Sequence, residues 1–407
     1  KMVNPKVIYI ALLLFFFNSC EEQPLVVNDA DLSLSVDTVS FDALESTTYQ
    51  VPPLMGGSKY LYLGQDSGYT FNYNFIRASK FSNTPYYISS GKTISTLHDY
   101  IDSSIVIDSV KLSLNFVDDS VTSNSLFYLR YFPNVSDSVF SRNNTNYLNY
   151  NANYSDIISY GEIVNDTTFS KLVFPVDTSY FKSFTDSSLI DFNNAFIIGV
   201  YNTEFNFYKF YSANNGQSTV SNLSVYFKHF VNDTLTIDTL NTHNIIDDLT
   251  ILTPPDLKDS DTLNLSISLA KGLKSLITVD TKSWQLPIGG VMRKAELLVI
   301  STQPDSSSSA IINSYLLSDI IIPKFFNIYQ NDNFTYDFSN GSSAVLIKNM
   351  LKFNLRSALS KSLSEKKTIH TFNLQPNIDT DPFKTLHFYK DNNIQFYPKL
   401  RITYVVP

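Results

Sequence analysis

Cysteine and tryptophan are almost missing from this 407-residue chain, which contains one residue of each. A single cysteine excludes a disulfide framework and a zinc site built from several thiolates. Only 12 glycines and 16 prolines occur, which excludes collagen-like and Gly/Pro-rich low-complexity sequence. Charged residues make up 17% of the chain and the net charge is -8. A general nucleic-acid-binding protein usually has a basic face, so no nucleic-acid partner is predicted.

No apolar run is long enough to cross a membrane as a helix. The apolar run at 7–17 falls short of the roughly 20 residues that a spanning helix needs and is typical of a signal peptide. It ends just before Cys20, and here the segment resembles a bacterial lipoprotein signal, in which the chain is cut before a cysteine and a lipid is attached to the sulfur. The resemblance implies a signal peptide at 1–19, lipidation of Cys20 and a tether at 20–27. An ordinary signal peptide with an incidental cysteine is the alternative.

Two acidic residues, Glu21 and Glu22, directly follow this cysteine. They resemble the export signal of surface-exposed lipoproteins in some Gram-negative bacteria. A mature lipoprotein carries several acyl chains, which hold it firmly to a membrane, whereas one chain holds it only marginally. The expected location is the outer membrane, lipid-anchored and at the cell surface; a simple solvated tether is the alternative interpretation of the acidic pair.

Apolar and polar residues alternate with a period of two through most of the chain, as in 110–116, 223–227 and 400–405. β-Branched and aromatic residues fill these runs, and clusters of Asn, Asp and Ser separate them, as turns require. Alternation with one polar face is typical of antiparallel sheets. The predicted fold class is therefore all-β, with one or two short helices at Arg356–Ser364 and Ser179–Phe184.

The two halves of the chain resemble each other, and five pairs of segments occur in the same order. These pairs are 31–39 with 233–240, 105–114 with 290–299, 172–176 with 352–355, 207–215 with 386–393, and 222–228 with 399–405. Chance alignment of two β-rich stretches is the alternative to a duplication. A boundary near Val231 predicts tandem antiparallel β-sandwich domains at 28–230 and 231–407, each jelly-roll-like and large enough to bury its own core.

Several short motifs resemble DNRLRE-type modules, and they cover roughly residues 30–407. The segments are Tyr60-Leu61-Tyr62-Leu63-Gly64, Ile107-Asp108-Ser109-Val110-Lys111-Leu112-Ser113-Leu114, Gly272-Leu273-Lys274-Ser275-Leu276-Ile277-Thr278-Val279 and Lys294-Ala295-Glu296-Leu297-Leu298-Val299. The resemblance implies a jelly-roll fold and a carbohydrate-binding-like accessory role. The layout also resembles uncharacterised surface lipoproteins of Gram-negative bacteria.

No constellation of catalytic or metal-binding residues stands out. The five histidines are separated in the sequence, which predicts surface or strand positions and no local metal-binding pair. His98-Asp99 with Asp102 has the composition of half an acid–base set and also of an ordinary turn. Neither a G-x-S-x-G elbow nor a phosphate-binding glycine loop occurs. The protein is predicted not to be an enzyme and to need no cofactor.

Paired aspartates could offer carboxylate oxygens to calcium, although none has the EF-hand spacing and solvated turns are the favoured interpretation. The pairs are Asp118-Asp119, Asp247-Asp248 and Asp379-Thr380-Asp381. No metal site is predicted.

Trp284 is the single candidate for ligand binding. It precedes Leu286-Pro287 and Gly289-Gly290, which predicts a loop at the rim of a sandwich, where ligand sites often lie. An indole there could stack on a sugar ring; alternatively it caps the core, which is the favoured interpretation.

The preferred functional hypothesis is a non-enzymatic, surface-exposed lipoprotein that binds glycan or another envelope component. Its expected partners are the membrane, through the lipid, and polysaccharide or envelope proteins. A structural or adhesion protein that contacts other proteins without a small ligand is the alternative, and a hydrolase with an unrecognised site is the least favoured.

Overall fold

The computed structural model describes residues 35–406, apart from 13 internal segments. These are 89–90, 119–120, 133–139, 151–154, 166–169, 180–194, 202–205, 217–220, 232–233, 304–307, 319–340, 379–380 and 392–394. The predicted signal peptide at 1–19, Cys20 and the tether at 20–27 lie outside the described residues. So does most of the helix predicted at Ser179–Phe184.

The all-β prediction is confirmed: the described residues form several antiparallel sheets with short helices between strands. We name two units by their strands. Unit A contains β2 (Tyr60–Asp66), β3 (Tyr69–Ala78), β4 (Phe81–Tyr87), β5 (Thr93–Thr96), β6 (Ile105–Asn115), β7 (Leu126–Tyr131), β8 (Ile157–Asn165), β9 (Ser170–Val176), β10 (Ala195–Tyr201), β11 (Phe207–Tyr211), β12 (Asn222–Val231) and β13 (Thr234–Thr253). Unit B contains β1 (Ser35–Gln50), β14 (Leu265–Ile267), β15 (Leu273–Asp280), β16 (Val291–Ile300), β17 (Ser308–Leu316), β18 (Ser342–Leu346), β19 (Met350–Asn354), β20 (Ile369–Pro376), β21 (Leu386–Phe388) and β22 (Lys399–Val406).

Helices are few in the described part of the chain. They are the 3₁₀ turns η1 (Leu97–Ile101) and η3 (Ala213–Asn215) and the α-helices α2 (Asp259–Leu263) and α3 (Arg356–Ser364). The bounds of α3 are those predicted from the sequence, because Leu355 and Leu359 are buried on one face against unit B. Across the described ranges, no helix combines the length and apolarity that a membrane crossing would need.

The main sheet of unit A closes on itself. Its strands run in the order β10-β7-β8-β9-β6-β12-β13-β3, and β10 also pairs with β3. The closure depends on two strands that each change their pairing partner part-way along their length. β13 pairs with β12 up to Asn244 and with β3 from Ile245 onward, and β8 passes in the same way from β7 to β9. Strands β2 and β11 extend the sheet beside β3.

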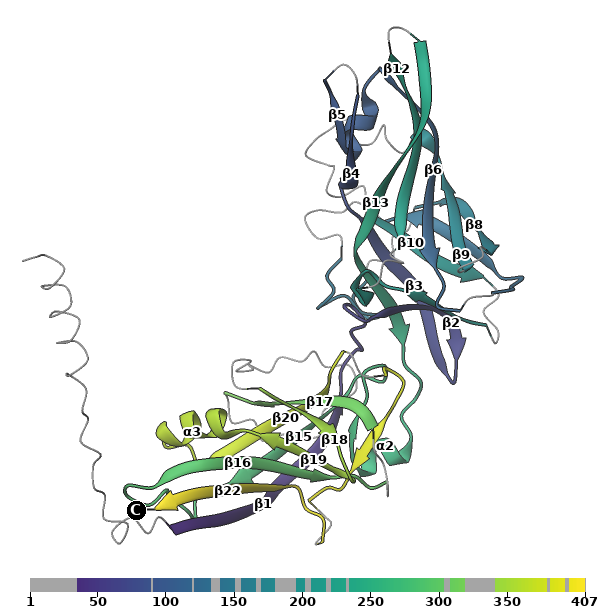
Figure 1. Ribbon diagram of the computed structural model, residues 1–407. Helices are drawn as coiled ribbons and strands as arrows, with labels where there is room; N and C mark the ends of the chain where they lie inside the picture. The colour runs from purple at the N-terminus through teal and green to yellow at the C-terminus, as the bar shows by residue number, and fades with distance from the viewer. Residues whose placement is uncertain are drawn as a thin grey trace, which may run out of the picture.

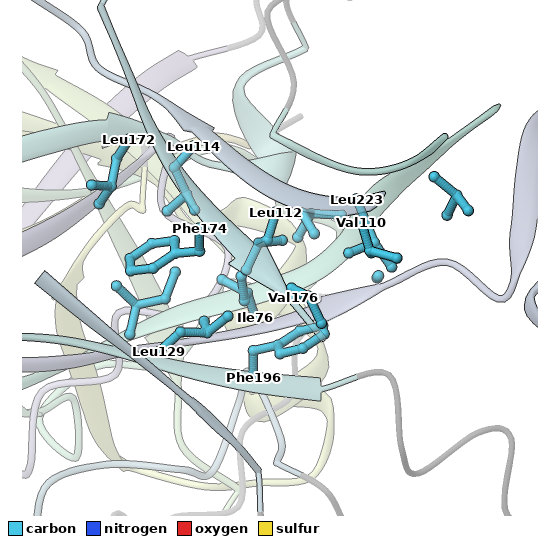
Figure 2. Close-up of a cluster of buried hydrophobic side chains, with 14 of the residues drawn as sticks. Ile76, Val110, Leu112, Leu114, Leu129, Leu172, Phe174, Val176, Phe196 and Leu223 are labelled. Carbon is cyan, nitrogen blue, oxygen red and sulfur yellow. The ribbon is translucent and has the colours of Figure 1, made fainter. Parts of the chain in front are cut away.

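Alternation of side chains fills the interior of unit A. Val110, Leu112 and Leu114 of β6 are buried, while Lys111 between them is exposed. Figure 2 shows these three side chains within one buried cluster, together with Phe174 and residues from other strands. A pleated strand sends successive side chains to opposite faces, so the period-two pattern read in the sequence becomes one buried and one solvated face.

Unit B repeats this strand order. Its main sheet has the strand order β18-β17-β20-β15-β1-β22-β16-β19. A bridge between Ile347 and Met350 joins the ends of β18 and β19. The long strand β1 pairs with β22 up to Asp42 and with β15 from Ala43. It therefore occupies in unit B the place that β13 occupies in unit A.

This pairing divides the strands differently from the predicted domains 28–230 and 231–407. Figure 1 shows β1 in the lower body beside β22, and β13 in the upper body beside β12 and β3. The reason lies in packing: Phe41 of β1 is buried in the core of unit B, and Leu249 of β13 is buried in unit A. Local alternation predicts that both are strands, but it carries no information about which sheet each one joins.

Candidate functional site

A cavity of about 790 Å³ lies at one end of unit B. Two segments line it: the loop that joins β15 to β16, and α3 with the turn that follows it. The lining residues are Thr281, Trp284, Gln285, Leu286, Gly290, Val291, Met292, Arg356, Ser360, Leu363, Ser364, Lys366, Lys367 and Thr368. The single tryptophan of the chain, singled out in the sequence, therefore belongs to this site.

Trp284 is half-buried, and its ring both caps the core and lines the cavity. Its centroid lies 6.1 Å from the ring of Phe41 in an edge-on arrangement and 5.4 Å from that of Tyr404. The Trp284 backbone N–H donates to the Thr281 carbonyl over 3.0 Å, which fixes the turn that presents the indole. The two interpretations of Trp284 are thus not exclusive: one part of the ring packs on β1 and β22, and another part is accessible from the cavity.

The apolar part of the lining comes from both segments. Leu286 and Met292 contribute from the loop and the start of β16, and Leu363 from α3. The Ser360 hydroxyl lies 3.8 Å from the sulfur of Met292, so α3 is in direct contact with β16 at the cavity wall. A ligand here would meet apolar surface as well as the face or edge of an indole.

Every charged residue of the lining is basic. Arg356 and Lys366 have no ion-pair partner among the residues that the structure describes. Lys367 pairs with Glu365 over 3.1 Å and also donates to the Ser318 carbonyl over 3.2 Å. Lys366 has a positive φ of 58°, and its N–H donates to the Leu363 carbonyl over 2.9 Å. This left-handed residue ends α3 and puts Lys366 and Lys367 at the cavity.

A buried histidine forms hydrogen bonds with both segments that line the cavity. His370 of β20 lies with Nδ1 3.0 Å from the Ser362 hydroxyl on α3 and with Nε2 3.0 Å from the Thr281 hydroxyl. Burial lowers the pKa of His370 to about 4, Asp280 opposes this shift, and Lys367 adds to it. The imidazole is therefore neutral at physiological pH, and it connects α3 to the start of the Trp284 loop as a structural element.

The candidate acid–base set near η1 is a set of turn contacts. The Asp99 carboxylate accepts the backbone N–H groups of Ser95 and Thr96, and Asp102 pairs with Lys92 over 2.5 Å. The pKa of Asp102 is held below its usual range by hydrogen bonds from Lys92 and Ser104. His98 is exposed, and the structure does not bring these residues together around a cavity.

The aspartate pairs have different outcomes. Asp247 and Asp248, predicted as a solvated turn, are buried on β13. Arg77 and Arg142 both bind the Asp247 carboxylate, which neutralises it. Asp248 accepts from Ser212 over 2.8 Å, and burial raises its pKa to about 6. Asp119, Asp379 and Thr380 lie outside the described residues, so the groups Asp118-Asp119 and Asp379-Thr380-Asp381 are described only in part.

One cluster that the sequence did not indicate is a Ser–His–Asp chain in unit B. The Ser266 hydroxyl lies 2.9 Å from His387 Nδ1, and His387 Nε2 lies 3.9 Å from Asp261, whose other oxygen pairs with Lys271 over 2.7 Å. Ser266 is 0% exposed and Asp261 1% exposed, so no substrate reaches the hydroxyl. We interpret the chain as a buried polar network that joins β14, β21 and α2.

Within the described residues, no three His, Cys, Asp or Glu side chains are grouped closely enough to suggest a metal site. No protein-family model matches the chain, and no curated protein matches its sequence significantly. The Trp284 cavity is therefore the candidate functional site.

Proposed function

We propose that the protein is a non-enzymatic cell-envelope lipoprotein that binds glycan in the Trp284 cavity. It is attached through Cys20 to the outer membrane and exposed at the cell surface. The observation that supports ligand binding is the cavity of about 790 Å³, lined partly by the half-buried Trp284. Ligand pockets of proteins typically occupy about 300–1,000 Å³, with a mostly apolar lining and a few polar groups.

The chemistry of the lining favours a ring-shaped, polar ligand. An indole offers a flat apolar face on which a ring can stack. The Gln285 amide and the hydroxyls of Ser360 and Ser364 also belong to the lining, and such groups exchange hydrogen bonds with hydroxyl groups of a ligand. A sugar has both features, an apolar ring face and a rim of hydroxyl groups.

The strand order supports the further proposal that both units are jelly rolls. If β13 counts as the first strand of unit A, then β3, β6, β7, β8, β9, β10 and β12 follow as the second to the eighth. Neighbours round the closed sheet are then 1-2-7-4-5-6-3-8, the order of two interlocked Greek keys. Unit B has the same order if β1 counts first. The likeness to DNRLRE-type modules remains part of this proposal.

The test is a glycan array probed with residues 20–407 carrying Cys20→Ser, followed by titration calorimetry on the glycans that bind. Trp284→Ala is expected to weaken binding by roughly 5- to 150-fold, by analogy with the ~1–3 kcal/mol that aromatic stacking contributes for other planar ligands. Tyr87→Ala is the matched control, because Tyr87 is an exposed aromatic residue of unit A. Absence of binding to every glycan, or equal losses in both variants, would overturn the proposal in favour of a protein-contacting role.

A further inference from the structure

We infer that the ligand of the Trp284 cavity is an acidic glycan, in which sugar rings carry carboxylate or sulfate groups. This inference rests on the proposed function and narrows it to one substrate class. It is carried by the charge of the lining, which contains three cations and no carboxylate.

The basic lining contrasts with the molecule as a whole. The chain has 38 acidic and 30 basic residues, so a wall whose only charged groups are Arg356, Lys366 and Lys367 is a local exception. Concentrated charge of one sign raises the local concentration of ligands of the opposite sign.

The acids near the cavity cancel only part of this charge. Glu365 is adjacent in sequence and pairs with Lys367, and Asp280 accepts the backbone N–H of Lys282 over 2.8 Å. Arg356 and Lys366 have no such partner among the described side chains. A guanidinium binds a carboxylate or sulfate through two parallel hydrogen bonds, which suits a fixed acidic group on a sugar.

The test compares oligogalacturonate with its methyl-esterified form, which has the same sugar rings without their negative charges. Oligogalacturonate is expected to bind the intact chain at least about tenfold more tightly, with an affinity that falls as salt rises. Arg356→Gln combined with Lys366→Gln should remove that preference. The control is Lys111→Gln with Lys348→Gln, which removes two charges from exposed positions outside the cavity.

Each outcome decides a different point. Trp284-dependent binding of both forms with equal affinity would overturn the acidic class and leave glycan binding intact. No Trp284-dependent binding of any glycan would overturn both. Binding to phosphatidylglycerol vesicles without binding to either sugar would also overturn both, and would assign the cations to a lipid surface.

A second inference comes from the strand order, and it is independent of the cavity. We propose that the two units are duplicates that have exchanged their first strands: β1 has moved into unit B and β13 into unit A. The two strands occupy equivalent places, since β1 lies between β22 and β15, and β13 lies between β12 and β3.

The sequences of the two strands support their equivalence. Val36-Asp37-Thr38-Val39 matches Ile237-Asp238-Thr239-Leu240, and a Pro-Pro pair follows each strand, at Pro52-Pro53 and at Pro254-Pro255. In the order of the sequence, β1 would be the first strand of unit A and β13 would be the first strand of unit B. The structure has the reverse arrangement, and each unit is complete only with the strand from the other half of the chain.

Residues 51–59 lead from β1 in unit B to β2 in unit A, and residues 254–264, which include α2, lead from β13 in unit A to β14 in unit B; we call these two connectors hinges. Proline fixes its own φ and disfavours a helical conformation of the preceding residue, so both hinges leave their strands in an extended direction. The Val51 N–H donates to the Gly272 carbonyl over 2.9 Å, which attaches the first hinge to unit B. Exchange of an identical element between similar units is a low-cost rearrangement, because each strand finds an equivalent partner set.

Engineered disulfides in a Cys20→Ser chain test the exchange. The Thr38 and Thr403 hydroxyls lie 3.2 Å apart across β1 and β22, so Thr38→Cys with Thr403→Cys should oxidise within one chain. Thr239→Cys with Thr403→Cys is the matched pair for unexchanged strands and should stay reduced. Oxidation of the second pair alone would overturn the proposal. A Thr38–Thr403 disulfide found only in covalent dimers would also overturn it, because exchange would then occur between copies.

Discussion

Ser35 at the start of β1 lies directly opposite Val406 at the end of β22. The Trp284 cavity is at this same end of unit B, because Trp284 packs against Tyr404 of β22. Residues 21–34 could span at most about 50 Å at ~3.5 Å per residue. If Cys20 carries a lipid, the first described strand therefore begins at the cavity end of unit B, within about 50 Å of the anchor.

The first prediction concerns that anchor. Cys20→Ala removes the only thiol of the chain, so it is expected to abolish labelling by radioactive palmitate and to release the protein from the membrane fraction. Ser19→Ala keeps a small residue before the proposed cleavage point and should leave labelling intact. Continued palmitate incorporation into the Cys20→Ala protein would contradict the lipoprotein assignment.

A second prediction concerns where the chain can be cut. Residues 28–230 lack β13, which leaves one edge of β12 and one edge of β3 unpaired, although β12 keeps β6 and β3 keeps β10 as a neighbour. Unpaired edges and an open core favour aggregation, so this fragment is expected to show no cooperative unfolding in urea. Residues 60–253 contain every strand of the closed sheet of unit A and should unfold cooperatively. Cooperative unfolding of 28–230 would show that β1 can replace β13.

The contrast between these fragments shows what sequence alone could predict. Local features were predictable: alternation located β6 and β22, and the spacing of Leu355 and Leu359 located α3. The pairing partners of β1 could not be predicted, because both sheets have the same strand order and each has a position that β1 could occupy. Trp284 was found through its rarity, whereas Arg356 reaches the same cavity through packing between distant segments, and no local signal indicated it.

A third prediction follows from two buried histidines. Burial lowers the pKa of His243 and of His370 to about 4, from about 6.5 in the unfolded chain. Between these pH values the unfolded chain binds more protons than the folded chain. The contribution of these histidines to the free energy of unfolding is therefore fully present above pH ~6.5 and falls as the pH decreases toward 4. The loss is on the order of 3 kcal/mol for each histidine. Asp248, whose pKa is raised to about 6, acts in the opposite direction: its stabilising effect is present at low pH and is lost as pH rises toward 6.

Urea unfolding of variants separates these contributions. His370→Gln should reduce the loss of unfolding free energy between pH 7 and pH 4.5, relative to the unmodified chain. Ser364→Ala changes a residue of the neighbouring helix α3 without removing a titratable group, and its pH profile should match that of the unmodified chain. An unchanged profile in His370→Gln would mean that this histidine is not kept neutral by burial.

A fourth prediction concerns the contact between the first hinge and unit B. Gly272 has a φ of +66°, and a Cβ added to it would lie 1.8 Å from the Val51 carbonyl oxygen. Gly272→Ala should therefore reduce the free energy of unfolding by about 2–4 kcal/mol, through backbone strain and displacement of the hinge. Gly216 is a matched control, with a φ of +71° and no atom within 4 Å of an added Cβ. Gly216→Ala should cost only the left-handed strain of roughly 1–2 kcal/mol; equal losses in both variants would contradict a tight hinge contact.

The last prediction uses the single indole as a reporter. Trp284 is half-buried beside Arg356 and Lys366, so its fluorescence should be partly accessible to quenchers, and the basic lining should concentrate anions around it. Iodide is therefore expected to quench the folded chain more strongly than caesium at equal concentration. Arg356→Gln with Lys366→Gln should reduce quenching by iodide and leave neutral acrylamide unaffected. Emission that resists all three quenchers would mean that the ring is sealed within the core, and stacking on a ligand would then require the loop at 281–290 to open.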